Sequence, residues 1–172
     1  MVARASAVRC AVAGRPERAR GKAPLRGMIT DDGSTTPVSD FGFELEPNTH
    51  PASDDARAGI LADPGFGRYF TDHMAHVRWT QDGGWHGAAV RPYAPLQLDP
   101  ATAVLHYAQE IFEGIKAYRH ADGSVWAFRP EKNAERFRNS ARRLALPELD
   151  TGTFVNSLKA LVSQDADWVP TP

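Results

Sequence analysis

Arg136 is the residue whose type and position are best suited to chemistry, and it lies shortly after Pro130. A guanidinium stays charged at physiological pH and presents a planar fork of N–H donors that matches phosphate or carboxylate oxygens. Near the start of a helix, free backbone N–H groups and the positive end of the helix dipole add to that attraction. Anion binding is therefore the chemistry expected here. From spacing alone, an ion pair with Glu131, Glu135 or another solvated carboxylate is the favoured alternative.

Two aromatic residues upstream, Tyr107 and Phe112, could line an apolar pocket. Aromatic side chains supply rigid apolar area, and tyrosine adds a hydroxyl group. Such a pocket would suit a branched aliphatic side chain. The alternative is that both residues belong to the core, which pattern alone favours for Phe112. His106 is interpreted as structural, because a lone histidine beside an aromatic is more often a hydrogen-bonded structural residue. Glu113 is left as structural as well.

The elements that must position these residues are a strand, a hairpin and a helix. An aromatic-rich strand is expected to begin near Leu105, and residues 111–119 and 125–128 are expected to form a hairpin around an Asp-Gly turn. After Pro130, apolar residues recur at helical spacing until Pro147 ends the helix. A second helix is expected at about residues 153–164. The apolar positions of the two helices are Phe137, Ala141, Leu144, Ala145, Phe154, Leu158, Leu161 and Val162.

The preceding part of the chain is rich in predicted strands. Residues 74–80 alternate as in a strand, and Gln81 to Gly84 form a turn signal. Residues 90–98 are predicted to be extended at a sheet edge, because Pro92 and Pro95 interrupt them. A strand-rich half followed by two helices predicts an α+β fold in two layers rather than a regular βαβ alternation.

Three regions are expected along the chain. Residues 1–40 are expected to be disordered; their first 26 positions hold seven basic side chains against one acid. This leader resembles an organelle transit peptide, but we favour a mis-assigned start, with Met28 as the true first residue. Residues 41–64 are predicted to be an acidic, Pro/Ser-rich loop whose Phe41 and Phe43 could dock on a partner surface. Residues 65–172 are the expected folded domain.

Composition limits the classes of function. Of the 172 residues, 42% are hydrophobic and 24% charged, as in globular proteins large enough to bury a core. A net charge of −1 argues against polyanion binding, and no aromatic platform is interleaved with the basic leader. No apolar run approaches the ~18 residues of a membrane helix, and the single Cys10 permits no internal disulfide. We expect a cytoplasmic protein with no metal, nucleic-acid or membrane partner.

Read together, several segments resemble the N-terminal small domain of branched-chain amino acid aminotransferases, class IV enzymes that use pyridoxal 5'-phosphate on fold type IV. The resemblance runs in order and with close spacing from about Gly65 to Pro170. The matching segments are 70–74 (FTDHM), 105–107 (LHY), 112–118 (FEGIKAY), 128–130 (FRP), 133–136 (NAER) and 146–147 (LP). The resemblance implies a homodimeric enzyme that passes the amino group of leucine, isoleucine or valine to the cofactor and then to 2-oxoglutarate, giving glutamate.

The resemblance also implies roles for four residues. Arg136 matches the arginine that binds the cofactor phosphate. Phe66 and Phe112 match aromatics that line the pocket for the substrate side chain. Tyr107 matches a tyrosine that reaches toward the neighbouring protomer's site.

The family's catalytic lysine, which forms the Schiff base with the cofactor, has no counterpart in this sequence. The four lysines are Lys22, Lys116, Lys132 and Lys159, and the family's position lies downstream of them in a second domain. We therefore expect a small domain that is incomplete at its C-terminus, inactive alone and catalytic as part of a full-length enzyme. The alternatives are a non-catalytic stand-alone module that pairs its sheet edge with another chain, and another fold-type IV enzyme, such as a D-amino acid aminotransferase or an aminodeoxychorismate lyase.

Overall fold

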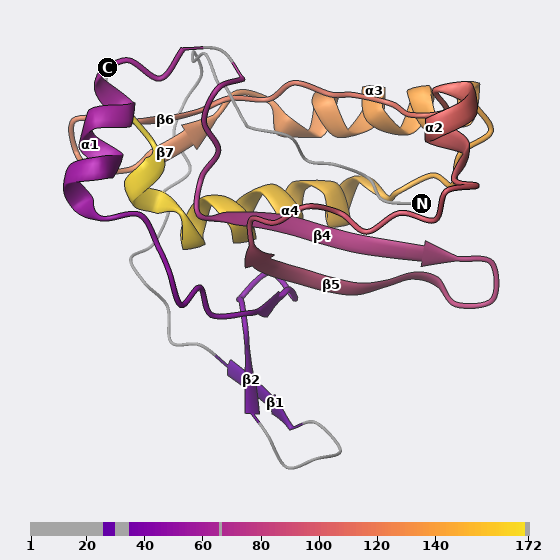
Figure 1. The fold of residues 1–172 in the computed structure, drawn as a ribbon, viewed down its shortest axis with the longest axis horizontal. Coiled ribbons are helices and arrows are strands. Elements are labelled where there is room, and N and C mark those ends of the chain that lie inside the picture. Colours follow the sequence, from indigo (N-terminus) through magenta and orange to yellow (C-terminus); the bar gives the residue numbers. More distant parts are fainter. Residues whose placement is uncertain (1–25, 30–34, 66, 171–172) are drawn as a thin grey trace.

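The computed structural model describes residues 26–29, 35–65 and 67–170. A five-stranded sheet has the order β1-β2-β3-β5-β4, and a separate two-stranded hairpin consists of β6 and β7 (Figure 1). The strands are β1 (Arg26–Ile29), β2 (Thr35–Val38), β3 (Glu44–Leu45), β4 (His73–Thr80), β5 (Gly84–Pro92), β6 (Ala117–Arg119) and β7 (Val125–Ala127). The helices are α1 (Asp54–Ala62), α2 (Ala103–Tyr107), α3 (Pro130–Arg143), α4 (Thr151–Gln164) and the 3-10 helix η1 (Ala166–Trp168). None of these helices has both the length and the apolar character needed to cross a membrane.

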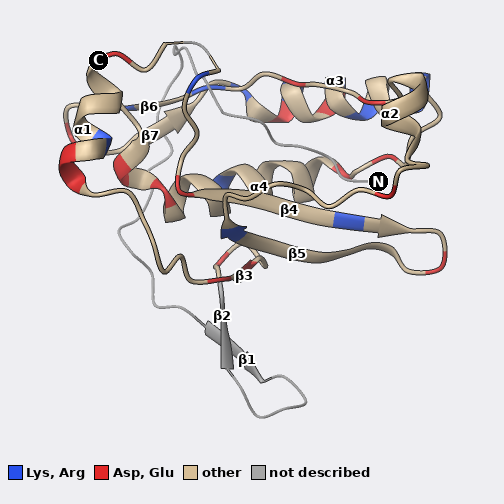
Figure 2. Ribbon diagram, in the orientation of Figure 1, with Lys and Arg blue, Asp and Glu red and all other residues tan. Residues whose placement is uncertain are grey.

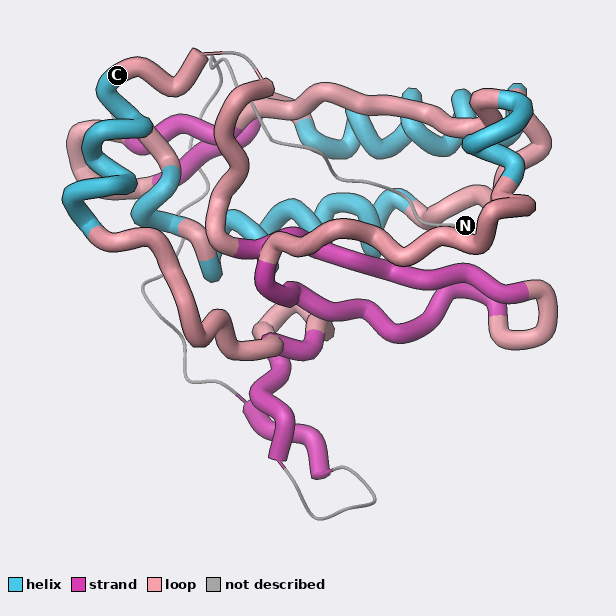
Figure 3. Tube along the Cα trace, viewed as in Figure 1, coloured by secondary structure: helices cyan, strands magenta, loops and turns pink. Residues whose placement is uncertain are grey.

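Helix α4 lies between the β4–β5 hairpin and helix α3, so the helices stack on one side of the hairpin (Figures 1 and 3). The rings of Phe137 on α3 and Phe154 on α4 pack with their centroids 5.2 Å apart. The segregation of helices from strands confirms the expected α+β class.

The β4–β5 hairpin forms where the sequence predicts a strand and a turn. Its strands pair antiparallel, and the pairing shifts register between His76 and Arg78. The predicted edge position of residues 90–98 is wrong for the part that forms a strand. Strand β5 lies between β3 and β4, because Glu44 and Leu45 pair with it in parallel. Its last residue is Pro92, which cannot donate a further ladder hydrogen bond.

Phe43 stands at the centre of the main core, although the sequence suggested a partner surface for it. Its side chain is 2% exposed, just before β3. The buried residues clustered with it come from β4, β5 and α4, and are Ala75, Val77, Val90, Ala160 and Leu161. A smaller cluster joins Ile115, which precedes β6, to Leu158 on α4. Helix α4 therefore contributes to both clusters.

Both long helices occur where the apolar spacing predicts them. Helix α3 has Pro130 in its first turn, where the missing N–H costs nothing. It ends at Arg143, before the expected limit at Pro147, and Ala145 beyond it has a positive φ of 52°. Helix α4 begins at Thr151, close to the expected start at residue 153, and ends at the expected Gln164.

Several short elements differ from the sequence predictions. The segment around Leu105 forms helix α2 rather than a strand, and β6 begins at Ala117 rather than at residue 111. Helix α1 lies within the predicted loop 41–64, and its first turn is capped by the Ser53 hydroxyl, which accepts from the Ala56 N–H at 3.2 Å. Because α1 buries no residue, it carries no apolar periodicity for the sequence to reveal. Within the range 1–40, β1 and β2 are strands, while residues 1–25 and 30–34 lie outside the described part.

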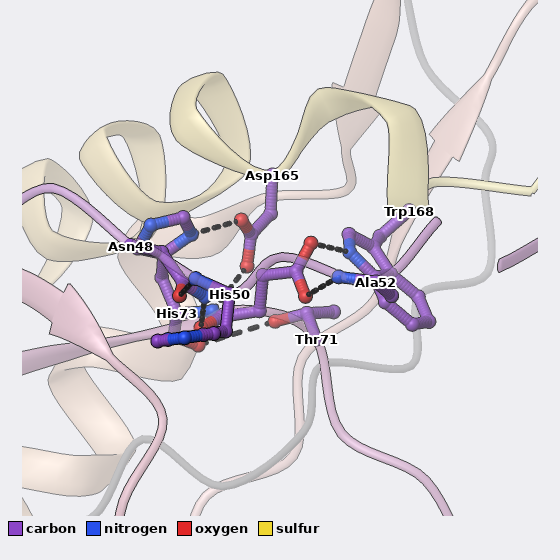
Figure 4. A network of polar contacts seen from close by, with 8 residues as sticks. Asn48, His50, Ala52, Thr71, His73, Asp165 and Trp168 are labelled. Atoms are coloured by element: carbon purple, nitrogen blue, oxygen red, sulfur yellow. Dashed lines mark hydrogen bonds and ion pairs between the residues drawn. The ribbon is translucent and has the colours of Figure 1, made fainter. Parts of the chain in front are cut away.

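A buried polar pair joins the start of β4 to the end of α4 (Figure 4). The Asp165 carboxylate lies 2.6 Å from His73 Nδ1 and accepts the His73 backbone N–H at 3.0 Å. Beside it, Asp72 accepts from Trp168 Nε1 at 2.8 Å and from the Ala52 N–H at 2.9 Å. These bonds fasten η1 and the chain before α1 to the sheet.

Replacing Asp150 with alanine should destabilise the protein by about 1 kcal/mol at pH 7, the usual cost of losing an N-cap. Asp150 Oδ1 accepts the Thr153 N–H at 2.8 Å at the start of α4. Hydrogen bonding to Thr153 lowers the pKa of Asp150 below its ordinary value of 3.8. This contribution is therefore present above pH 3.8 and is lost as the pH falls through the lowered native pKa. Urea unfolding from pH 7 to pH 2 should show the two proteins converging, and a difference that grows on acidification would contradict the cap.

Candidate functional site

A surface depression of about 560 Å³ lies between α3 and the chain that precedes β6. Its lining residues are Ile111, Phe112, Arg136, Asn139, Ser140, Arg143 and Leu144. Arg136, Ser140 and Arg143 share one face of α3, because residues four and seven apart along a helix lie above one another. The depression is thus lined by two arginines and a serine together with apolar side chains. That combination suits a ligand with an anionic group and an apolar part.

Arg136 is the seventh of the 14 residues of α3, so it does not lie near the helix start as predicted, and it is held by a carboxylate from outside its own helix. Its Nη2 lies 2.5 Å from Glu113 Oε1, and its Nε lies 3.3 Å from Glu113 Oε2. Asn133 Nδ2 donates to the same Glu113 Oε1 at 2.8 Å. Arg136 therefore forms an ion pair, as the alternative predicted, but its partner is Glu113, whose side chain is 10% exposed rather than solvated. Glu135 instead pairs with Lys132, whose hydrogen bond lowers the pKa of Glu135.

The first turns of α3 carry charges of both signs, whereas every charged residue after Glu135 is an arginine (Figure 2). Arg142 pairs with Glu148 at 2.8 Å, and this hydrogen bond raises the pKa of Arg142 and lowers that of Glu148. Arg143 forms no ion pair with any other residue that the structure describes. Around the depression, the positive charge of Arg136 is balanced by Glu113, whereas the positive charge of Arg143 has no ion-pair partner among the described residues.

The structure brings together two of the four residues singled out by the resemblance. Phe112 and Arg136 both line the depression, and Phe112 is exposed rather than part of the core. Tyr107, at the end of α2, is 83% exposed and does not line it. Phe66 lies outside the described residues. His106 has the structural contact expected of it, because its Nε2 lies 2.6 Å from the Pro100 carbonyl oxygen.

Sequence reasoning missed several residues that line the depression. Asn139, Ser140 and Arg143 follow Arg136 at three, four and seven positions, so helical spacing could have placed them on the same face. The Glu113–Arg136 pair spans 23 positions between a loop and a helix, and no local spacing signals it.

The residues of the depression fit the phosphate of the implied cofactor. Glu113 engages Nε and Nη2 of Arg136, while a guanidinium has five N–H donors, so donors remain for an anion. Arg143 and Ser140, which also line the depression, carry further donors, and Phe112 adds apolar area. No lysine of the described residues lines the depression. Lys132 pairs with Glu135, and Lys159 lies 5.9 Å from the centre of the Phe41 ring.

Comparison with known proteins finds no family model that matches the chain, but it finds several similar proteins that share one named activity. The chain is 62% identical to a probable branched-chain-amino-acid aminotransferase of Streptomyces coelicolor over 136 residues. These residues make up 79% of the chain and 36% of the relative. It is 59% identical over 128 residues to the branched-chain-amino-acid aminotransferase of Mycolicibacterium smegmatis, covering 74% of the chain and 35% of the relative. It is 54% identical over 121 residues to that of Mycobacterium tuberculosis, covering 70% of the chain and 33% of the relative.

The chain thus spans about a third of the length of these curated relatives. Identity above half over more than a hundred residues extends far beyond the short segments that first suggested the resemblance. Over that third of their length, the chain is homologous to the branched-chain-amino-acid aminotransferases.

Proposed function

We propose that this chain supplies the phosphate-anchoring part of a pyridoxal-phosphate-dependent branched-chain transaminase. The observation that carries the proposal is the depression in which Arg136 and Phe112 meet, in a chain homologous to enzymes of that name. The reaction transfers the amino group of leucine, isoleucine or valine to 2-oxoglutarate. Its products are a branched 2-oxo acid and glutamate.

The residues of the chain would act by binding and orienting. Arg136, with Arg143 and Ser140 beside it, would hold the cofactor phosphate. Phe112, with Phe66, would line the pocket for the branched side chain, and Tyr107 would reach toward the site of the neighbouring protomer in a cytoplasmic homodimer. When bound, the cofactor supplies the electron sink for amino transfer. The lysine that this chemistry requires is not among the residues of the depression.

A chimera tests the proposal. The 136 matched residues would replace their counterparts in the Streptomyces coelicolor relative, and glutamate formed from leucine and 2-oxoglutarate would be measured. The chimera should transaminate, whereas the 172-residue chain assayed alone should form no glutamate. A folded chimera without activity, or turnover by the 172-residue chain alone, would contradict the proposal.

In the chimera, Arg136→Ala should raise the dissociation constant for pyridoxal phosphate about 10- to 100-fold, the range expected for losing a charge-assisted hydrogen bond. Arg142→Ala is the matched control. Arg142 lies on the same helix, pairs with a glutamate and is 60% exposed against 61% for Arg136, but it does not line the depression. Equal losses in the two variants would show a general charge effect and remove Arg136 from its proposed role.

A further inference from the structure

The ion pair between Arg136 and Glu113 is asymmetric in its burial. The side chain of Arg136 is 61% exposed, whereas that of Glu113 is 10% exposed. Glu113 is also fixed from the protein side, because Asn133 Nδ2 donates to its Oε1 at 2.8 Å. Asn133 is itself 9% exposed, and its Nδ2 donates to the Gly114 carbonyl oxygen at 2.8 Å. The carboxylate is therefore the fixed member of the pair, and the guanidinium is the member that it restrains.

The contact with Glu113 leaves a usable edge on the guanidinium. The carboxylate engages Nε and Nη2, which form one side of the planar group. Nη1 forms no hydrogen bond with any other described residue. A second, end-on pair of donors is therefore still available to an anion in the depression that Arg136 lines.

We propose that Glu113 and Asn133 are positioning residues that hold Arg136 with its free edge presented to an anionic ligand. An unrestrained arginine carries considerable rotamer entropy, which is lost when it binds. Here the Asn133–Glu113 relay has already restricted the side chain, so less is lost when the anion arrives. That the anion is the cofactor phosphate rests on the proposed function. The restraint of Arg136 rests only on its contacts with Glu113 and Asn133.

The restraint of Arg136 can be tested without any ligand by ¹⁵N NMR of the full chain. The Nε–Hε signal of Arg136 is the probe, and it is assigned as the signal that disappears in Arg136→Lys. In the unsubstituted protein, the heteronuclear NOE of this signal should approach that of the backbone. It should fall to values of a mobile side chain in Asn133→Ala, which leaves the charge unchanged, and in Glu113→Gln. It should stay unchanged in Glu135→Gln, which removes a carboxylate of the same helix that pairs with Lys132. If Asn133→Ala does not fold, the loss of order in Arg136 is judged from Glu113→Gln against Glu135→Gln.

Titration with inorganic phosphate at constant ionic strength then tests the consequence. Asn133→Ala should weaken phosphate binding about 2- to 10-fold, the entropic cost of ordering one long side chain. An Arg136 signal that stays ordered in folded Glu113→Gln would overturn the proposal. So would phosphate binding that tightens in Glu113→Gln beyond the change in Glu135→Gln, because Glu113 would then be a competitor for the site. If no phosphate binds but Arg136 loses order as expected, the proposed function fails and the positioning role stands.

Discussion

Phe43→Ala is expected to lower the free energy of unfolding by about 3–5 kcal/mol, the usual range for removing a buried phenylalanine ring. The ring is 2% exposed and belongs to a cluster with side chains of β4, β5 and α4. This cluster joins side chains of all three elements to Phe43, so the cavity would lie where the sheet and α4 join. A loss of that size is a large part of the total stability of a typical domain.

Urea unfolding followed by far-ultraviolet circular dichroism measures the effect of the Phe43 substitution. Phe112→Ala is the matched control, since it removes the same ring from a side chain that is 71% exposed. The control should stay within about 0.5 kcal/mol of the unsubstituted protein. Similar values for the two variants would mean that Phe43 does not lie in the core.

Asp165→Ala is expected to cost about 3–5 kcal/mol, because it breaks a buried polar pair from one side. Asp165 Oδ1 lies 2.6 Å from His73 Nδ1, and Asp165 Oδ2 accepts the His73 backbone N–H at 3.0 Å. The substitution would leave this buried backbone N–H without its acceptor and Nδ1 without its partner. His73 Nε2 already has no partner among the described residues, so the buried ring would keep no hydrogen bond to them.

Two further variants separate this account from a general charge effect. Asp165→Asn keeps one acceptor for the backbone N–H of His73 and should cost less than Asp165→Ala. Asp167→Ala removes an exposed carboxylate two positions along the chain and should stay within about 0.5 kcal/mol. Thermal unfolding of the three variants in parallel gives the order, and equal destabilisation by Asp165→Ala and Asp167→Ala would refute the buried-pair interpretation.

The parts of the fold that the sequence predicted are those with strong local signals. The strand at 74–80, its turn and the helices α3 and α4 have clear periodicity and breakers. Helix α1 was not predicted, because it buries no residue. Ser53 followed by Asp54 and Asp55 is nevertheless a signal for the start of a helix. The place of β5 inside the sheet depends on β3, a strand of two residues that pairs in parallel. So short a partner has no detectable pattern of its own.

The candidate site was predictable in its residue types but not in its connections. Arg136 and Phe112 were both singled out from the chemistry of their side chains, but pattern alone favoured an ion pair for the first and a core position for the second. The resemblance implied the phosphate and pocket roles for them. Their meeting in one depression, together with the relay through Glu113 and Asn133, depends on the path of a loop with no regular structure. Such a path is set by tertiary packing, which neither periodicity nor spacing encodes.

The bond between His73 and Asp165 has a consequence for the order of events during synthesis. The two residues are 92 positions apart, so at a translation rate of about 5–20 residues per second Asp165 is made roughly 5–18 s after His73. Throughout that interval the apolar face of β4 exists without α4, the helix that covers it. The nascent chain therefore carries an uncovered hydrophobic hairpin for longer than many domains need to fold.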